Sequence, residues 1–125
     1  MNPYASPQAY RESSVLTASP EQLVVMLYDG AGRFLRQADA ALGEGAMEHA
    51  HERLSRGEAI IDELLATLDM DQGQVSERLQ AIYVYCKRCL TESRRERDVT
   101  KIRLVIRLLG ELREAWAQVA AGVPA

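Results

Sequence analysis

The sequence lacks the features of a membrane-spanning, secreted or disulfide-stabilised protein. Its 125 residues contain no run of about 18 apolar residues, which is the length needed to span a bilayer. The opening residues, MNPYASPQAY, have no basic region followed by an apolar stretch, so they do not read as a secretory signal. Only two cysteines and no N-glycosylation sequon are present. These absences predict a cytoplasmic protein with reduced thiols and no direct membrane insertion.

Signatures of catalysis and of cofactor binding are also missing. The sequence shows neither a Ser-His-Asp or Cys-His arrangement nor a glycine-rich phosphate loop. Cys86 and Cys89 form CKRC, but a zinc site needs a second pair of ligands, and a redox pair is expected at a helix start. We therefore expect two small buried cysteines and no enzyme activity, cofactor or metal.

Two other groups of residues suggest ligands only weakly. His49 and His51 point to opposite sides of a helix, about 200° apart, so they cannot share a metal and are expected on the surface. Asp69 and Asp71 match the start of a calcium-binding loop, but the required glycine position holds Gln74 and the closing glutamate position holds Gln80. We expect neither group to bind a metal.

The chain instead shows the apolar spacing of long helices. No segment alternates polar and apolar residues with a period of two, and helices are predicted over 20–42, 46–68, 75–92 and 98–121. The DMDQG segment at 69–73 predicts a turn. Because the links between these helices are short, the fold class is predicted to be all-α, an antiparallel up-down-up-down four-helix bundle. We expect this bundle over 20–125, preceded by an N-terminal arm over 1–19.

The last three helices each predict one inward stripe. For the helix over 46–68 the stripe is Met47, Ala50, Leu54, Gly57, Ile61, Leu64 and Leu68. For the helix over 75–92 it is Leu79, Ile82, Cys86 and Leu90, with Tyr83 and Tyr85 to the sides. For the last helix it is Val99, Ile102, Ile106, Leu109, Trp116 and Val119, with Asp98 as the cap.

The first helix has more apolar surface than one face of a small bundle requires. Ser19, Pro20 and Glu21 form a typical helix start. One apolar stripe consists of Leu23, Met26, Leu27, Gly30 and Phe34, and a second of Val24, Tyr28, Ala31 and Leu35. This helix is therefore either the central one or one that keeps a strip for a partner.

Charge is distributed unevenly along the chain, whose net charge is -3. Residues 1–86 contain six Lys and Arg against thirteen Asp and Glu, whereas residues 87–125 contain nine against five. The basic residues alternate with acidic ones, which favours a solvated face or a docking face for an acidic protein over a nucleic-acid site.

Several motifs in collinear order resemble the flagellar secretion chaperone family, FliS. The arm contains NPY and then AY, followed by SxxxTASPEQLVVMLYDGAxRFL; AIIDELLATLD, LxxIYxYCxxxL and ELREAW occur in the next three helices. The resemblance covers nearly the whole chain. Three extra residues between Tyr4 and Tyr10 and a more basic last helix depart from the family pattern.

The resemblance implies a cytoplasmic export chaperone for flagellin. Members of the family bind the C-terminal segment of flagellin, which is disordered until bound, prevent premature polymerisation and assist delivery to the flagellar type III export gate. Such a segment can fold as helices in apolar grooves, and the doubled apolar surface of the first helix would supply one. A weak homodimer is a further possible association.

The expected partner-binding residues combine the arm with the first helix. They are Tyr4, Tyr10, Leu16, Leu23, Val24, Leu27, Tyr28, Ala31 and Leu35. We expect Val24 and Ala31 to face outward into the groove, and the tyrosines of the arm to cover it in the empty protein. For Leu27, Phe34 and Trp116 we expect a core position.

Two functions of other classes are alternatives. A histidine phosphotransfer module is also a helical bundle, but a lysine and a glycine normally follow its reactive histidine, whereas Glu52, Arg53 and Leu54 follow His51. A nucleic-acid-binding bundle would use the basic last helix.

Overall fold

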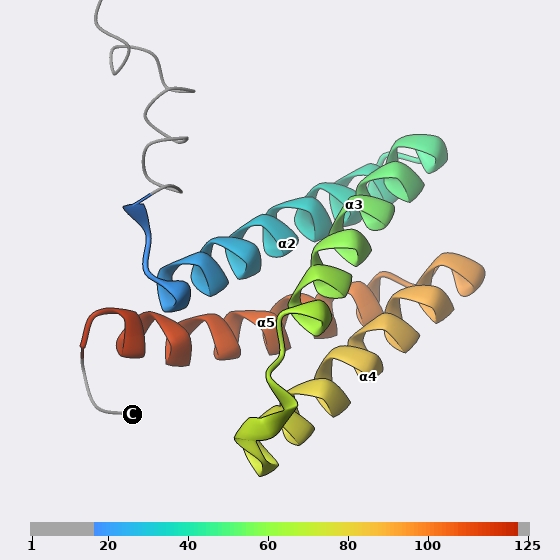
Figure 1. The fold of residues 1–125 in the computed structure, drawn as a ribbon. Coiled ribbons are helices and arrows are strands. Elements are labelled where there is room, and N and C mark those ends of the chain that lie inside the picture. Colours follow the sequence, from blue (N-terminus) through green and yellow to red (C-terminus); the bar gives the residue numbers. More distant parts are fainter. Residues whose placement is uncertain (1–16, 123–125) are drawn as a thin grey trace, which may run out of the picture.

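The computed structural model describes residues 17–122, and this part of the chain forms four α-helices and one 3₁₀ turn (Figure 1). They are α2 (Pro20–Gly43), α3 (Met47–Ala66), η2 (Met70–Gln72), α4 (Gln74–Glu96) and α5 (Val99–Ala120). The prediction of an all-α four-helix bundle is confirmed. None of the helices within 17–122 is long and apolar enough to cross a bilayer. Most of the predicted arm, residues 1–16, lies outside the described residues.

The helices pack in a ring in which neighbours along the chain are neighbours in space. α2 contacts α3 and α5, and α4 contacts the same two helices. Asp29 of α2 forms an ion pair with Arg113 of α5, and Asp39 of α2 forms one with Arg103 of α5, each at 2.9 Å. Since residue numbers rise on α2 while they fall on α5, the two helices are antiparallel. Exposed ion pairs of this kind contribute little stability, but they show which residues of α2 lie opposite which residues of α5.

The start of α2 has the predicted cap. Ser19 Oγ accepts a hydrogen bond from the Gln22 backbone N–H at 3.2 Å, and the Ser19 N–H donates to Gln22 Oε1 at 2.8 Å. This reciprocal capping box satisfies two backbone donors that the first helical turn leaves free. Pro20 occupies the first helical position, which fixes where α2 begins.

α2 and α3 approach each other closely because glycines line their interface. A Cβ atom at Gly57 of α3 would lie 2.8 Å from Leu35 Cδ2 of α2, and one at Gly30 would lie 3.1 Å from Ile60 Cδ1. Gly57 and Gly30 are both buried. The missing side chains thus allow Leu35 and Ile60 to pack against the backbone of the facing helix.

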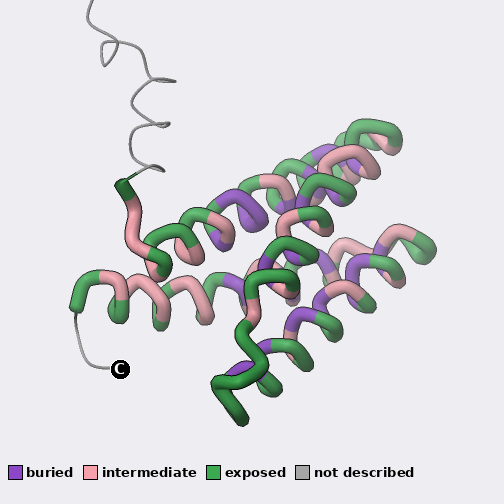
Figure 2. The backbone as a smooth tube through the Cα atoms, viewed as in Figure 1, coloured by how far each residue is buried: buried purple, intermediate pink, exposed green. Residues whose placement is uncertain are grey.

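The core gathers where the four helices cross (Figure 2). Its buried members are Tyr28, Ala31, Leu35, Ala38, Leu54, Ile61, Leu64, Leu79, Tyr83, Cys86, Cys89, Leu90, Ile102, Val105 and Leu109. By contrast, no residue of 20–27 in α2 or of 110–120 in α5 is buried. These ends of α2 and α5 lie side by side, away from the junction of α3 and α4 (Figure 1).

Several predicted orientations are wrong. Tyr83, expected at the side of α4, is 1% exposed because its hydroxyl pairs with that of Tyr28 inside the core. Val119, expected inward, is 43% exposed because the α3–α4 pair has diverged from α5 at that end. Phe34, expected in the core, is half-buried at its edge, with the Arg53 guanidinium 5.2 Å from its ring centre.

Other expected core positions lie at the margin. Leu27, Trp116, Ile82 and Ile106 are partly buried and pack against the core. Val105 is fully buried, although the predicted stripe of the last helix did not contain it.

α4 continues four residues beyond its predicted end at Glu92. Ser93 is buried, and its Oγ donates a hydrogen bond to the Asp98 carbonyl at 2.7 Å. Arg94 pairs with Glu58 of α3 at 2.9 Å. These contacts keep the polar segment helical up to Glu96, and Arg97 then ends the helix in the left-handed region, with φ 55°.

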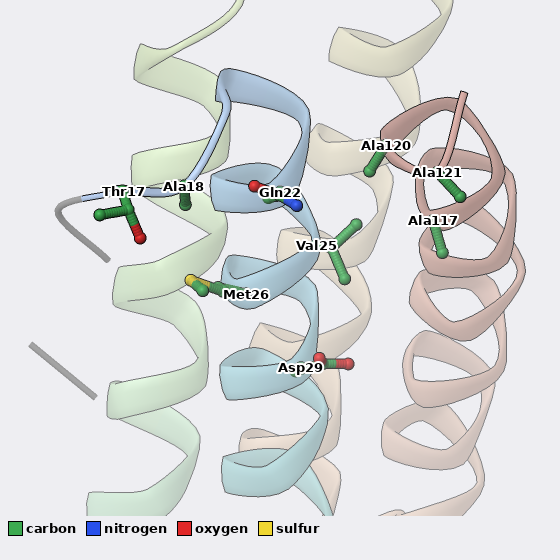
Figure 3. A pocket seen from close by; sticks show the side chains of 9 residues that line it. All are labelled: Thr17, Ala18, Gln22, Val25, Met26, Asp29, Ala117, Ala120 and Ala121. Atoms are coloured by element: carbon green, nitrogen blue, oxygen red, sulfur yellow. The ribbon is translucent and has the colours of Figure 1, made fainter. Parts of the chain in front are cut away.

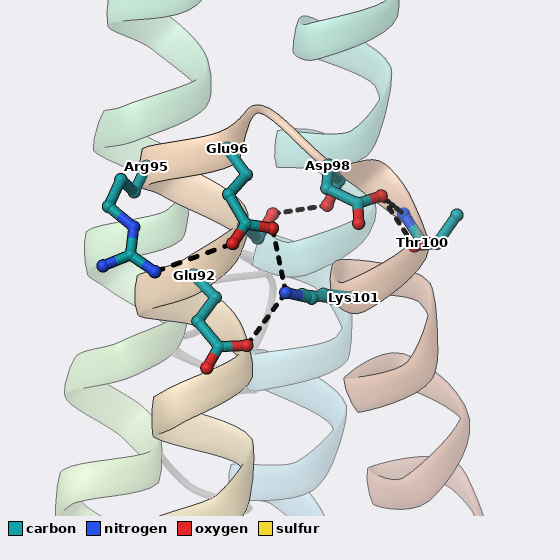
Figure 4. A network of polar contacts seen from close by, with 7 residues as sticks. Glu92, Arg95, Glu96, Asp98, Thr100 and Lys101 are labelled. Carbon is teal, nitrogen blue, oxygen red and sulfur yellow. Dashed lines mark hydrogen bonds and ion pairs between the residues drawn. The ribbon is translucent and has the colours of Figure 1, made fainter.

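The turn from α4 to α5 is held by a network of charges (Figure 4). Asp98 caps α5 as predicted and accepts a hydrogen bond from the Thr100 N–H at 2.9 Å. Lys101 Nζ reaches Glu92 and Glu96, each at 2.9 Å. The hydrogen bonds to the two carboxylates raise the pKa of Lys101, and the hydrogen bond from Lys101 lowers that of Glu96, so both groups stay charged near neutral pH.

Candidate functional site

Two hollows open beside the N-terminal half of α2, one on each side. The first, which we call the bundle cleft, has a volume of about 570 Å³ and lies where the α2–α5 pair diverges from the α3–α4 pair. It is lined by Pro20, Glu21, Val24, Leu64, Thr67, Leu68, Asp69, Gln72, Val75, Ser76, Leu79, Tyr83 and Trp116. The second, the α2–α5 groove, has a volume of about 550 Å³. Both volumes lie in the range usual for ligand sites.

The walls of the bundle cleft come from all four helices and are mostly apolar. Val24 of α2 and Trp116 of α5 form one side, and Leu64 of α3 with Leu79 of α4 form the other. Val75, at the start of α4, is 64% exposed. An apolar side chain entering from outside would find contacts from four helices at once.

Tyr83, which lines the bundle cleft, belongs to a buried pair of hydroxyls. The side chains of Tyr28 and Tyr83 share a hydrogen bond, and their rings lie 6.4 Å apart at a tilt of 47°. Burial raises the pKa of both phenols above the ordinary value, so both remain neutral. Because both phenols are neutral, this hydroxyl pair places no charge beside a bound segment.

The α2–α5 groove has smaller side chains. α2 contributes Gln22, Val25, Met26 and Asp29. α5 contributes Ala117 and Ala120, followed by Ala121 at its C-cap, and Thr17 and Ala18 precede α2 (Figure 3). The three alanines are small enough to leave room above the helix surface. Met26 is 38% exposed and points away from α5 toward α3 (Figure 3).

The predicted partner-binding residues divide into three groups. Leu23 is 38% exposed, Val24 lines the bundle cleft, and Leu27 is partly buried against the core. Tyr28, Ala31 and Leu35 are buried core residues. The expectation that Ala31 faces outward is wrong, because α3 and α5 pack against α2 and leave Ala31 fully buried. Tyr4, Tyr10 and Leu16 lie outside the described residues.

Most of the bundle cleft was not predicted as a site. Leu64, Leu79 and Trp116 were expected as core, and Leu68, Val75 and Tyr83 were not linked to the first helix. Their helical spacing is the same whether they face another helix or an opening. In the sequence, the one distinguishing feature is that the apolar Val75 directly follows the predicted turn at 69–73, which by itself does not indicate an opening.

The remaining candidates do not form a site. Both cysteines are buried and free, as predicted, and burial raises the pKa of Cys86 to about 12. His49 is exposed and His51 half-buried. Among residues 17–122 no three His, Cys, Asp or Glu side chains come together as metal ligands would.

Much of the basic stretch is neutralised within the bundle. Arg94, Lys101, Arg103 and Arg113 all form ion pairs with carboxylates of the same chain. Paired cations of this kind offer less charge to phosphate groups, so the arrangement favours a solvated face over a nucleic-acid site.

Comparisons with known proteins point to one family. The family model described as "Flagellar protein FliS" matches residues 2–123. The chain is 35% identical over 117 residues to the flagellar secretion chaperone FliS of Bacillus subtilis, which covers 94% of this chain and 85% of the relative. It is 38% identical over 111 residues to the protein of that name from Salmonella typhimurium, covering 87% and 82%. For that of Vibrio cholerae the identity is 33% over 117 residues, covering 90% and 86%.

Proposed function

The chain belongs to the FliS family of flagellar secretion chaperones, and we propose that it binds the C-terminal segment of flagellin in the cytoplasm. In this role it prevents premature polymerisation of flagellin and assists its delivery to the flagellar type III export apparatus. The observation that carries the proposal is the bundle cleft, an open apolar cavity formed by all four helices.

The shape of the cleft supports binding of a helix that forms on contact. An amphipathic segment binds a groove through apolar side chains that recur every three or four residues. The first two turns of α2 lie between the bundle cleft and the α2–α5 groove and contain no buried residue. A segment that crossed this part of α2 would therefore find apolar contacts on both sides.

The proposed contacts are the accessible residues of the predicted set. Leu23, Val24 and Leu27 touch the segment directly, together with Trp116, which lies on the same side of the cleft as Val24. Tyr28, Ala31 and Leu35 support the wall from behind, since a fully buried side chain cannot reach a partner unless the bundle opens. Tyr4, Tyr10 and Leu16 of the arm cover the apolar surface while flagellin is absent.

Binding of the flagellin C-terminal segment is the direct test. The purified chain is titrated with this segment by calorimetry, and we expect a complex whose formation is accompanied by a gain in helical circular dichroism. Val24→Asp should weaken binding at least tenfold, because it places a charge on an apolar wall. Val84→Asp is the matched control, because Val84 is 46% exposed on α4 and lines neither cavity, so affinity should be unchanged.

Two results would contradict this proposal. One is absence of binding by the wild-type chain. The other is an equal effect of Val24→Asp and Val84→Asp, which would place the site elsewhere.

The arm is tested by deleting residues 1–11. If the arm covers the cleft, the truncated chain should bind more apolar dye when free and should retain its affinity for flagellin. A large loss of affinity would instead make the arm part of the binding site.

A further inference from the structure

The rim of the bundle cleft is acidic. Glu21 and Asp69 are among its lining residues, and these residues include no Lys, Arg or His. The α2–α5 groove likewise has Asp29 and no basic side chain in its lining. Asp29 is paired with Arg113, so the unneutralised negative charge at this end of the bundle lies on the side of the bundle cleft.

The two carboxylates of the rim are held in different ways. Asp69 accepts hydrogen bonds from the Asp71 N–H at 3.0 Å and from Gln72 Nε2 at 3.1 Å, and these donors lower its pKa. Glu21 is half-buried in the first turn of α2, and its side chain has no hydrogen-bond or ion-pair partner among residues 17–122. Its charge is favoured by the helix dipole but is not neutralised by any described cation.

Five other carboxylates of the bundle differ from Glu21 because a cation of the same chain pairs with each of them. Asp29, Asp39, Glu58, Asp62 and Glu92 all have an Arg or Lys partner within 4 Å. A half-buried carboxylate beside an apolar cavity gains most from a cation that arrives with the ligand, because the ligand also displaces water from around the pair.

We propose that Glu21 and Asp69 select a bound segment that carries a Lys or Arg beside its apolar anchor. The proposal rests on the function proposed above and defines the chemistry of the segment. Glu21 and Val24 are three residues apart on α2, so both face the same cavity. A helix lying along α2 would match them with an apolar side chain and a cation one turn apart. The apolar side chain would lie between Val24, Leu79 and Trp116.

A purely structural role for Glu21 can be separated from this one. An acidic residue in the first turn stabilises any helix, and Glu48 occupies the corresponding turn of α3. Glu48 is exposed and lines neither cavity. Glu48→Gln therefore reproduces the effect on the helix dipole without the effect on the rim.

The test measures affinity for the flagellin C-terminal segment at 50 and 300 mM NaCl. Glu21→Gln should weaken binding about two- to fivefold at 50 mM and less at 300 mM, as expected for a partly exposed pair. Glu21→Lys should weaken it more, and Glu48→Gln should leave it unchanged. Thermal melts confirm that each variant is folded. Equal affinities for Glu21→Gln and Glu48→Gln would overturn the proposal.

A second probe makes this result independent of flagellin itself. Two amphipathic peptides are compared that are identical except for Lys or Glu one turn from a leucine. Preference for the lysine peptide that disappears in Glu21→Gln supports the acidic rim, even if the flagellin segment fails to bind and the function above is refuted. No preference, or a cleft closed by a second copy of the chain in sedimentation, would overturn it.

Discussion

At the scale of single residues, the hydroxyl pair of Tyr28 and Tyr83 connects the core to the bundle cleft. Tyr28 comes from α2 and Tyr83 from α4, which are diagonal neighbours in the ring, and both are almost fully buried. Each hydroxyl is the partner that makes burial of the other tolerable. The pair therefore stabilises the fold only as a unit.

Tyr28→Phe should destabilise the protein by about 1 to 3 kcal/mol, because it leaves the Tyr83 hydroxyl buried without its partner. Tyr83→Phe should do the same, while the double variant should lose clearly less than the sum of the two. Urea denaturation measures all three, and Tyr85→Phe, at a 44% exposed residue, is the control with little change. Additive losses would show that the hydroxyls do not depend on each other.

These two residues also show where sequence reasoning stops at this scale. Both were recognised as apolar-face residues, but Tyr28 was assigned to the groove and Tyr83 to the side of its helix. Neighbouring stripes on a helix lie only tens of degrees apart, so the spacing cannot decide which one faces the core. That choice depends on the rotation of each helix against its neighbours.

At the scale of elements, the contact between α2 and α3 depends on the absence of a side chain at Gly57. A Cβ atom added at Gly57 would lie 2.8 Å from the Leu35 side chain, inside the core. Gly110 of α5 is also within a helix, but a Cβ atom there would meet nothing within 4 Å. The two glycines therefore separate helix propensity from packing.

Gly110→Ala should stabilise the bundle by up to about 1 kcal/mol, the usual gain for this change within a helix. Gly57→Ala should instead destabilise it by about 1 to 3 kcal/mol, because Leu35 must leave its rotamer or the helices must separate. The midpoint temperatures of thermal unfolding show whether each variant is more or less stable than the wild-type chain. Stabilisation by Gly57→Ala would show that Leu35 can move at little cost.

The helices themselves were predicted well because their signals are local. Ser19 and Asp98 caps, the 69–73 turn and the links all follow from residues close together in sequence. The predicted end of α4 was wrong because the residues of its last turn are polar, which resembles a link. Contacts with α3 and with Asp98 keep that turn helical. The bundle cleft could not be predicted, since it depends on the angle between helix pairs.

At the scale of the whole molecule, the folded state retains protons that the unfolded chain would lose in alkali. Burial raises the pKa of Cys86 from its ordinary value of 9.0 to about 12. For an acid whose pKa is raised by folding, the contribution to stability is complete below pH 9 and is lost as pH rises toward 12. Burial also raises the pKa of Tyr28, so its contribution to stability is likewise lost as the pH rises above 10.

The free energy of unfolding should therefore be nearly constant from pH 7.5 to 8.5 and fall above pH 9. Its slope should approach about 1.4 kcal/mol per pH unit for each contributing group. Urea denaturation with a reducing agent at pH 7.5 to 10.5 measures this. Cys86→Ala should be less stable at pH 7.5 but decline less steeply; an unchanged slope would assign the effect to other groups.

Trp116 is the only tryptophan of the chain, and it lies half-buried in the wall of the bundle cleft. Its indole fluorescence therefore arises entirely from that one location. A segment that fills the cleft removes water from the ring, which shifts emission to shorter wavelength and shields it from acrylamide quenching. The protein thus has an intrinsic optical reporter for cleft occupancy, readable without attaching a dye to either partner.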